Sequence, residues 1–384
     1  MKEAAIVGVG MHKFGRFPHE TIEEIGQDAV LKALRDTNNL DYKKVQIAFC
    51  GSMHGGTAIG NRVLSRIGLT GIPVINVENA CASGSAAIRL AVQAIASGEY
   101  DTVLAFGVEK PGRGFLPLNS YPMWEHLSGL GLPPVQLALR ATRYMYDYGA
   151  TIQHLAKVVV KSRKNAMMNP NAMYHKTVTL DEVINDRPVS FPLTITMLAP
   201  PCEGAAAAII TSKKIAKQFN AKPVTIAAAV TGTAQYGTTF CGMSSGFETD
   251  STRIKTPEVT TILSQMAYEK AGIGPKDINL IELNDNTAAS ELMFLEELGI
   301  CPPGEAIKLL NEDRTEIYGD IAVNASGGLL SMGEPVGAMG IAQAAELVWQ
   351  LRGQAGQRQV VKAKVGMCET AGAGGNCSVI ILKR

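Results

Sequence analysis

One cysteine stands where a thiol could act as a nucleophile. Cys81 lies in the small-residue run Ala80 to Ala87, where a short apolar strand leads into a helix that is apolar on every side, a pattern that predicts a buried helix. A thiol at a helix N-terminus feels the positive end of the dipole, which lowers its pKa and favours the thiolate that attacks carbonyl carbons. A buried free cysteine can equally be a small hydrophobe. Both readings stay open at this point.

Alternating strands and helices must position this cysteine. We expect helices at 21–35 and 58–67 and another that starts at Cys81, between strands at 4–9, 45–49, 74–77 and 102–108. Thr21 and Glu24 have the spacing of a capping box at the first helix. The alternation predicts an α/β fold with a mainly parallel sheet covered by helices on both faces.

A long insertion interrupts this alternation. Residues 110–195 contain repeated prolines and glycines and then two predicted helices, at 136–148 and 152–168. Long insertions in α/β folds usually carry the binding apparatus. We therefore expect a loop domain that covers the substrate.

The second part of the chain repeats the pattern of the first. A strand at 223–230, a helix at 259–271 and a strand at 278–283 follow in the same order as the opening elements. The sequence thus predicts two similar halves, 1–220 with the insertion and 221–384, and a cleft between them.

Composition excludes several classes of function. Lys+Arg 36 against Asp+Glu 35 leaves no excess of positive charge, so nucleic acid is not expected as a partner. No apolar run reaches membrane-spanning length, and we expect a cytoplasmic protein that does not bind membranes. The cysteines are Cys50, Cys81, Cys202, Cys241, Cys301, Cys368 and Cys377. Their number is odd and none of them forms a Cys-x-x-Cys pair. This pattern favours a reducing compartment and argues against a zinc site in this chain alone.

Five motifs together resemble the thiolase superfamily. They follow the family's order over nearly the whole chain, and the likeness is greatest to the sterol-carrier-protein-type thiolases of bacteria and archaea: Asn79–Gly84, Glu282–Asp285, Asn324–Gly328, Gly333–Ala338 and Gly372–Gly375. The resemblance implies a thiolase fold, with two βαβαβαββ halves in a layered αβαβα arrangement and an inserted loop domain.

The resemblance also implies a reaction and its residues. Cys81 would attack the 3-keto carbon of a 3-oxoacyl-CoA and pass its acyl group to free CoA, which is a substrate; no permanently bound cofactor or metal is expected. Asn284 would hold a water in one oxyanion hole, and the backbone N–H groups of Cys81 and Gly372 would form another. Asn284 could instead cap a turn.

Two positions depart from the family pattern. Glu334 replaces the histidine of the Gly-His-Pro motif; a carboxylate can take the thiol proton if burial raises its pKa, but it cannot donate to an oxyanion while ionised. At the Cys-x-Gly motif, Glu369 takes the place of the acid/base cysteine and Cys368 precedes it. A register error of one residue would exchange the two, so both are candidates.

The glutamate in Gly-Glu-Pro is similar to that of thiolases that cleave 2-benzoylsuccinyl-CoA in anaerobic toluene degradation. Candidate aromatic walls are Phe115, Tyr121, Trp124, Tyr144, Tyr146 and Tyr148, and Arg113, Arg140 or Arg143 could meet the second substrate carboxylate. His126 could replace the missing imidazole, and Arg163 and Lys164 could meet CoA phosphates. Ser326 and Gly327 complete the candidate binding set. Packing or solvated surface positions explain these side chains equally well.

Partners and rival functions follow from the same resemblance. We expect a homodimer and a small zinc-containing OB-fold subunit. The alternatives are a condensing acyltransferase of the same fold, a thiolase-like aldolase, against which the retained Cys81 counts, and a catalytically silent subunit. An acyl adduct on Cys81 would separate the last of these from the enzymes.

Overall fold

The computed structural model describes residues 2–38, 40–112, 123–220, 222–235, 257–361 and 363–384. Its strands are β1 (Ala4–Met11), β2 (Ile47–Gly51), β3 (Val74–Val77), β4 (Thr102–Glu109), β5 (Pro188–Ser190), β6 (Leu193–Thr194), β7 (Gly204–Ser212), β8 (Val224–Thr233), β9 (Leu280–Glu282), β10 (Ala322–Val323), β11 (Val365–Gly372) and β12 (Asn376–Lys383). Its α-helices are α1 (Ile22–Arg35), α2 (Ile59–Ser65), α3 (Ser83–Ala96), α4 (Met123–Leu127), α5 (Pro133–Tyr148), α6 (Ile152–Ala166), α7 (Leu180–Ile184), α8 (Lys213–Phe219), α9 (Val259–Ala271), α10 (Ala288–Glu297), α11 (Ala306–Asn311), α12 (Gly328–Met332) and α13 (Met339–Arg352).

The strand order shows the internal repeat directly. The large sheet runs β10-β9-β11-β12-β8-β1-β7-β4-β2-β3. Within each half, the strands lie in the order third, second, fourth, fifth, first, counted along the chain. The two first strands, β1 and β8, pair with each other and join the halves edge to edge.

The sheet is mixed, which corrects the expectation of a mainly parallel one. In both halves the second strand pairs in parallel with the third and fourth, whereas the fifth strand is antiparallel to both of its neighbours. Strands that are apolar on both faces carry no pattern that records their direction, so the sequence could not distinguish these pairings.

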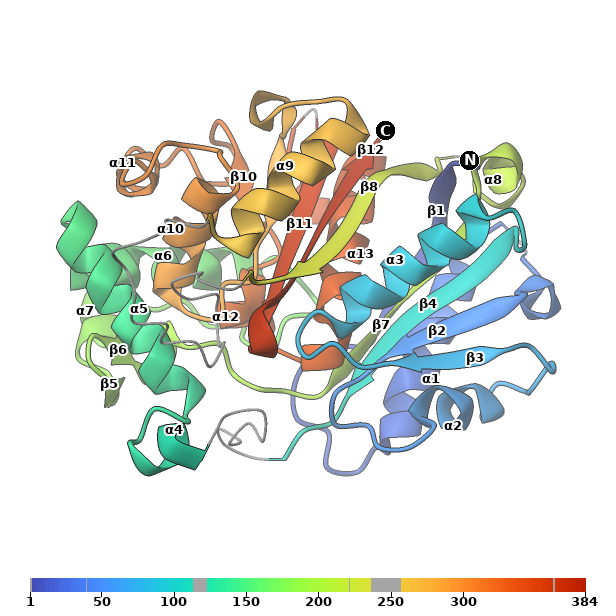
Figure 1. Ribbon diagram of the computed structural model, residues 1–384, viewed down its shortest axis with the longest axis horizontal. Coiled ribbons are helices and arrows are strands. Elements are labelled where there is room, and N and C mark those ends of the chain that lie inside the picture. Colours follow the sequence, from blue (N-terminus) through green and yellow to red (C-terminus); the bar gives the residue numbers. More distant parts are fainter. Residues whose placement is uncertain (1, 39, 113–122, 221, 236–256, 362) are drawn as a thin grey trace.

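The elements form the layered αβαβα arrangement of the thiolase fold (Figure 1). Three apolar clusters fill the spaces between layers. The first packs α1 and α2 on the N-terminal half of the sheet, the second surrounds α3 and α13 between the two halves, and the third packs α9 and α10 on the C-terminal half. This packing carries the hydrophobic stabilisation of both halves.

Local signals predicted several elements closely. Helix α1 begins after Thr21, whose side chain forms the expected capping box with Glu24. Strand β3 and helix α9 have the predicted bounds. Helix α3 is less buried than expected: Leu90 is partly exposed and Gln93 is exposed, and on the neighbouring edge strand Ile75 is 45% exposed.

The insertion follows β4 of the N-terminal half but packs on the C-terminal half. Helices α5 and α6 leave the N-terminal half and lie against α10, and α6 also lies against α12 (Figure 1). The Ser162 hydroxyl on α6 donates to the carbonyl of Gly327, and it also lies at hydrogen-bond distance, 2.7 Å, from the Ser331 hydroxyl. Among the described residues, no helix combines the length and apolar character that crossing a bilayer requires.

Candidate active site

Cys81 lies immediately before helix α3, between the two halves of the fold. The residue is buried, 3% exposed, and the Ser83 hydroxyl accepts from the Asn79 backbone N–H and donates to the Ala80 carbonyl, which fixes the turn that carries the thiol. Burial raises the pKa of the Cys81 thiol above its usual range, and the nearby Glu334 carboxyl raises it further. Backbone hydrogen bonds from Ala373 and from Cys81 itself act in the opposite direction. The thiol therefore needs a base.

Gly372 lies directly against the Cys81 backbone. A β-carbon placed on Gly372 would be 3.0 Å from the Cys81 nitrogen and 3.3 Å from the Ala82 nitrogen. A side chain at this position would crowd the Cys81 backbone, whereas the backbone conformation of Gly372, with φ −130°, is open to any residue. The backbone N–H groups that hydrogen-bond the thiol are those of Cys81 itself and of Ala373, which follows the end of β11.

Glu334 is held by its backbone between two segments. Its N–H donates to the Pro200 carbonyl at 3.0 Å, and its carbonyl accepts from the Cys202 N–H at 3.3 Å. Gly333, with φ +110°, makes the preceding turn, and a β-carbon there would be 2.6 Å from the Cys202 sulfur. Burial raises the pKa of the Glu334 carboxyl to about 8, which is the environment that a carboxylate base needs to act near neutral pH.

Asn284 is fully buried, and its side-chain amide is only partly satisfied by hydrogen bonds. Its Nδ2 donates to the Ala371 carbonyl at 3.1 Å, which orients the side chain. Its Oδ1 has no hydrogen-bond partner among the described residues. A buried acceptor of this kind calls for an explanation such as a water or a reacting group. The adjacent Asp285 accepts the Leu329 N–H at 2.6 Å, so the same loop fixes the start of α12.

Glu369 and Cys368 point to opposite faces of β11. The Glu369 carboxylate accepts the Asn284 N–H at 3.2 Å and contacts the Cys377 sulfur at 3.8 Å. Cys368 instead lies in the apolar cluster around α3 and α13, and burial and then Glu282 raise its pKa. Burial raises the pKa of Glu369 to about 8. The geometry therefore brings Glu369, and not Cys368, to Asn284.

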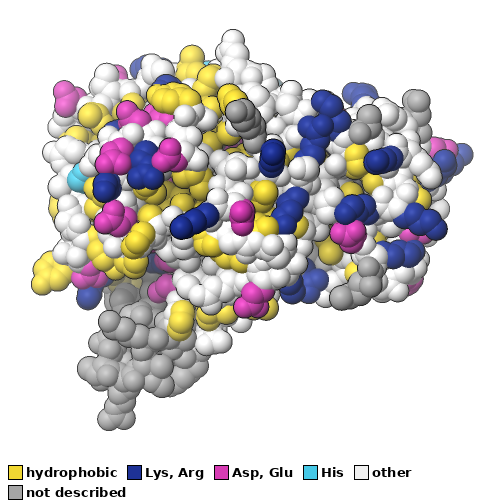
Figure 2. All heavy atoms as spheres, turned by 90° about the horizontal axis from the view of Figure 1, so that it is seen from above, with side chains coloured by type: hydrophobic (Ala, Val, Ile, Leu, Met, Phe, Trp, Pro, Cys, Tyr) yellow, Lys and Arg dark blue, Asp and Glu magenta, His cyan; other side chains and the backbone are white. Residues whose placement is uncertain are grey.

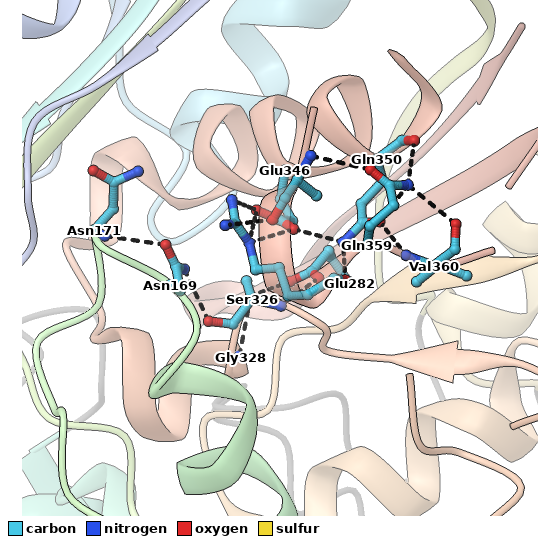
Figure 3. A network of polar contacts seen from close by, with 11 residues as sticks. Asn169, Asn171, Glu282, Ser326, Gly328, Glu346, Gln350, Gln359 and Val360 are labelled. Carbon is cyan, nitrogen blue, oxygen red and sulfur yellow. Dashed lines mark hydrogen bonds and ion pairs between the residues drawn. The ribbon is translucent and has the colours of Figure 1, made fainter. Parts of the chain in front are cut away.

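Ser326 forms part of a buried polar network with Glu282 and Gly328 (Figure 3). The Ser326 hydroxyl donates to Glu282 at 2.5 Å, and its N–H donates to the same carboxylate at 3.1 Å. Gly327, with φ +98°, packs so closely on α6 that a β-carbon would be 2.7 Å from the Ala166 β-carbon. The described contacts join both residues to the interior of the fold and do not bring them to Cys81.

The cationic candidates on α5 already have ion-pair partners. Arg140 pairs with Glu297 at 2.6 Å, and Arg143, three-quarters exposed, pairs with Asp147 at 2.6 Å. His126 lies on α4, with its ring against Gly131. Arg113, like Phe115 and Tyr121, lies outside the described residues.

The two candidates on α6 differ from each other. Lys164 pairs with Glu316 at the surface. Arg163 is buried and stacks on the Tyr174 ring, 3.6 Å from its centroid. Lys and Arg side chains also lie among Asp and Glu side chains on the face shown in Figure 2.

Sequence reasoning missed two further groups, one near the proposed nucleophile and one near the proposed base. Glu109, the last residue of β4, is fully buried and contributes to the raised pKa of Cys81. Cys202 lies near Glu334, and burial and then that carboxyl raise its pKa. Neither Glu109 nor Cys202 lies in any of the five motifs that resemble the thiolase superfamily. A charged residue that ends an apolar strand was the one signal available for Glu109.

A buried thiol that accepts hydrogen bonds from backbone N–H groups, with a carboxyl of raised pKa beside it, is typical of enzymes that transfer acyl groups through cysteine. Comparison with known families agrees with this class. Residues 4–184 match the model of the thiolase N-terminal domain, and residues 249–384 match that of a thiolase C-terminal domain-like family. The chain belongs to the thiolase family.

Several relatives match over most of the chain. It is 38% identical to rabbit (Oryctolagus cuniculus) sterol carrier protein 2, over 98% of this chain and 71% of the relative. It is 36% identical to acetyl-CoA acetyltransferase of Methanothermobacter thermautotrophicus over the full length of both, and 35% identical to the benzoylsuccinyl-CoA thiolase subunit BbsB of Thauera aromatica over 97% and 95%. A solved structure named Ltp2-ChsH2(DUF35) aldolase superimposes with a TM-score of 0.86 at 26% identity, covering 99% of this chain and 97% of that one.

Proposed function

We propose that this protein cleaves a 3-oxoacyl-CoA with CoA through an acyl-enzyme on Cys81. The observation that supports the proposal is the junction of Cys81 with the end of β11, where the backbone N–H groups of Cys81 and Ala373 hydrogen-bond the thiol. These donors would stabilise the oxyanion of a tetrahedral intermediate formed on the cysteine.

Glu334 takes the role of base in this proposal. Its ionised carboxylate accepts the Cys81 proton, and the thiolate attacks the 3-keto carbon of the substrate. The bond between C2 and C3 then breaks, which leaves the acyl group on Cys81 and an enolate thioester on the departing fragment. Free CoA takes the acyl group in the second half of the reaction and returns the thiol.

In this proposal Asn284 stabilises the enolate and Glu369 protonates it. The unpartnered Asn284 oxygen supports a bound water that donates to the enolate oxygen, as in the family. Glu369, hydrogen-bonded to the Asn284 backbone and with a pKa of about 8, is the acid that returns a proton to C2.

The substrate we propose is 2-benzoylsuccinyl-CoA, cleaved to benzoyl-CoA and succinyl-CoA in anaerobic degradation of toluene. The Gly-Glu-Pro segment and the 35% identity to BbsB support this choice. The relative named acetyl-CoA acetyltransferase supports a short-chain substrate as the alternative.

We also propose that the protein works as a cytoplasmic homodimer with a small zinc-containing OB-fold subunit. The edge strand β3 and the partly exposed apolar residues Ile75 and Leu90 support pairing of two copies through the sheet. The name of the aldolase structure, which includes a DUF35 component, supports a second subunit.

Intact-mass spectrometry tests the reaction. The protein, with and without a co-expressed small subunit, is exposed briefly to benzoyl-CoA or to acetyl-CoA. A benzoyl adduct that CoA removes, and that is absent from a Cys81→Ser variant, supports the proposal. An acetyl adduct without a benzoyl adduct indicates a short-chain acyl-CoA substrate instead. No adduct from either, with or without the subunit, overturns the acyl-enzyme and favours an aldolase or a silent subunit.

A further inference from the structure

Glu109 occupies a junction of four close-packed glycines beside the nucleophile. A β-carbon on Gly337 would lie 2.5 Å from the Ser52 α-carbon, and one on Gly107 would lie 2.3 Å from the Gly337 carbonyl oxygen. Gly84, in the first turn of α3, and Gly51, at the end of β2, are equally confined. The backbone of the Glu334 segment therefore rests directly on the helix that begins after Cys81.

The Glu109 carboxylate joins the segments that meet there. One oxygen accepts the N–H groups of Met53 at 2.9 Å and Gly337 at 3.0 Å. The other accepts the His54 N–H at 2.8 Å and the Ser52 hydroxyl at 3.4 Å. A carboxylate that accepts several backbone N–H groups is a strong, charge-assisted anchor. This anchor ties β4, the loop after β2 and the segment that follows Glu334.

His54 faces this carboxylate from the solvent side. Its Nδ1 lies 3.6 Å from Glu109, and 28% of its side chain is exposed. Its interaction with the Glu109 carboxylate raises the pKa of His54; burial acts in the opposite direction, and the charge of Glu78 adds to the rise. Arg62 approaches the same loop and donates to the Gly55 carbonyl.

The charge of Glu109 does not favour the thiolate. Glu109 and Glu334 both raise the pKa of Cys81, because a nearby negative charge opposes formation of another. If Glu109 assists catalysis, it does so through its hydrogen bonds and not through its charge. A protonated His54 would offset the negative charge that these hydrogen bonds require.

We propose that Glu109 is a positioning residue that sets Glu334 against Cys81, and that His54 balances its charge. This inference rests on the proposed function, in which Glu334 is the base for Cys81. Glutamine cannot reproduce the anchor, since only one of its two side-chain heteroatoms accepts, and the N–H donors to Glu109 approach both oxygens.

Two readouts on Glu109→Gln and His54→Asn separate positioning from structure. The first is the rate of Cys81 acylation by the acyl-CoA that labels the wild type. The second is the pH midpoint of Cys81 alkylation by iodoacetamide, located by peptide mass mapping, which needs no catalysis. His19→Asn, at an exposed histidine, is the matched control, and thermal unfolding reports folding.

The two variants differ in the alkylation midpoint. Glu109→Gln removes a negative charge, so the midpoint falls, while acylation slows about tenfold or more because Glu334 is displaced. His54→Asn leaves the anchor, and an imidazole is neutral at the alkaline pH where the Cys81 thiol ionises, so its midpoint stays that of the wild type and acylation slows less than in Glu109→Gln. His19→Asn changes neither readout.

Other outcomes contradict the inference. Wild-type acylation in Glu109→Gln, or an alkylation midpoint that does not fall in this variant, would overturn it. If Glu109→Gln does not fold, Glu109→Asp, which keeps the charge but shortens the reach of the carboxylate, decides: slowed acylation supports the inference and wild-type acylation overturns it. A wild type that alkylates but never acylates rejects the proposed function instead, so the two failures are distinguishable.

Discussion

Gly372 and Cys81 approach so closely that a β-carbon on Gly372 would stand 3.0 Å from the Cys81 backbone nitrogen. The contact joins the last strand pair of the C-terminal half to the start of a helix of the N-terminal half. The proposed oxyanion hole therefore exists only where the two halves meet.

Gly372→Ala should reduce acylation of Cys81 by about 10²–10³-fold, the usual cost of losing an oxyanion donor, because its methyl group enters the space between the N–H groups. The measurement is single-turnover acylation by mass spectrometry. Gly274→Ala is the control, since a β-carbon there meets nothing within 4 Å. Equal rates for the two variants would reject the oxyanion hole.

Acylation should rise with pH through about 8, where the Glu334 carboxyl loses its proton and becomes a base. Glu334→Gln should remove this step and slow acylation by about 10²–10⁴-fold. In the same variant, the rate of Cys81 alkylation at a given pH should instead increase, because the carboxylate that raises the pKa of the thiol is absent. Stopped-flow acylation and iodoacetamide profiles across the pH range provide both readings. An unchanged pH step in the variant would assign the base elsewhere.

Asn284→Ala should slow thiolysis by about 10²–10³-fold if its amide positions the water of an oxyanion hole. The lost bond to Ala371 should cost about 1 kcal/mol of unfolding free energy. Urea titration separates this structural effect from the kinetic one. A loss of stability with full turnover would make Asn284 a turn-capping residue, the alternative that the sequence left open.

Glu369→Gln and Cys368→Ala should differ, since the two side chains lie on opposite faces of β11. We expect Glu369→Gln to slow thiolysis and Cys368→Ala to leave turnover near that of the wild type. Burial raises the folded-state pKa of Glu369 from 4.5 to about 8, so between these values the folded state keeps a proton that the unfolded state has lost.

The stability of the wild type should therefore fall as pH rises through that window, and Glu369→Gln should make the fall smaller. Urea midpoints at about pH 5.5 and about pH 8 measure the difference. A variant whose midpoint falls as much as that of the wild type would contradict an ionising, buried Glu369.

Ile75→Lys should weaken the proposed dimer, because Ile75 is an exposed apolar residue on an edge strand and lysine blocks edge-to-edge pairing. Sedimentation velocity over a range of concentrations measures the change. Leu69→Lys, at another exposed apolar position outside the strands, is the control. A wild type that sediments as a monomer would reject the homodimer.

The sequence predicted what short-range patterns encode and little of what distant contacts decide. Capping at Thr21, the strand before Cys81 and the repeated order of elements follow from local spacing. The anchoring role of Glu109 could not be predicted, because the N–H groups that bind it come from residues 53, 54 and 337. The choice between Glu369 and Cys368 depended on which face of β11 meets Asn284, and adjacent residues in an unplaced strand give no answer.

Candidate binding residues show the same limit. Arg140 looked available for a substrate carboxylate, yet its ion-pair partner Glu297 lies on a helix of the other half. The hydroxyl of Ser326, which a motif had marked, is used by Glu282. Charge and residue type suggest what a side chain can bind, whereas tertiary structure decides what it does bind.

The anchoring of the insertion gives the molecule a mechanical linkage. Ser162 on α6 holds Gly327 and Ser331, and the backbone N–H groups of Met173 and Tyr174 hold the carbonyls of Met332 and Ser331, just before Glu334. These hydrogen bonds connect the insertion to the segment that directly precedes the proposed base. A displacement of the segment expected to cover the substrate would therefore also displace the proposed catalytic carboxylate.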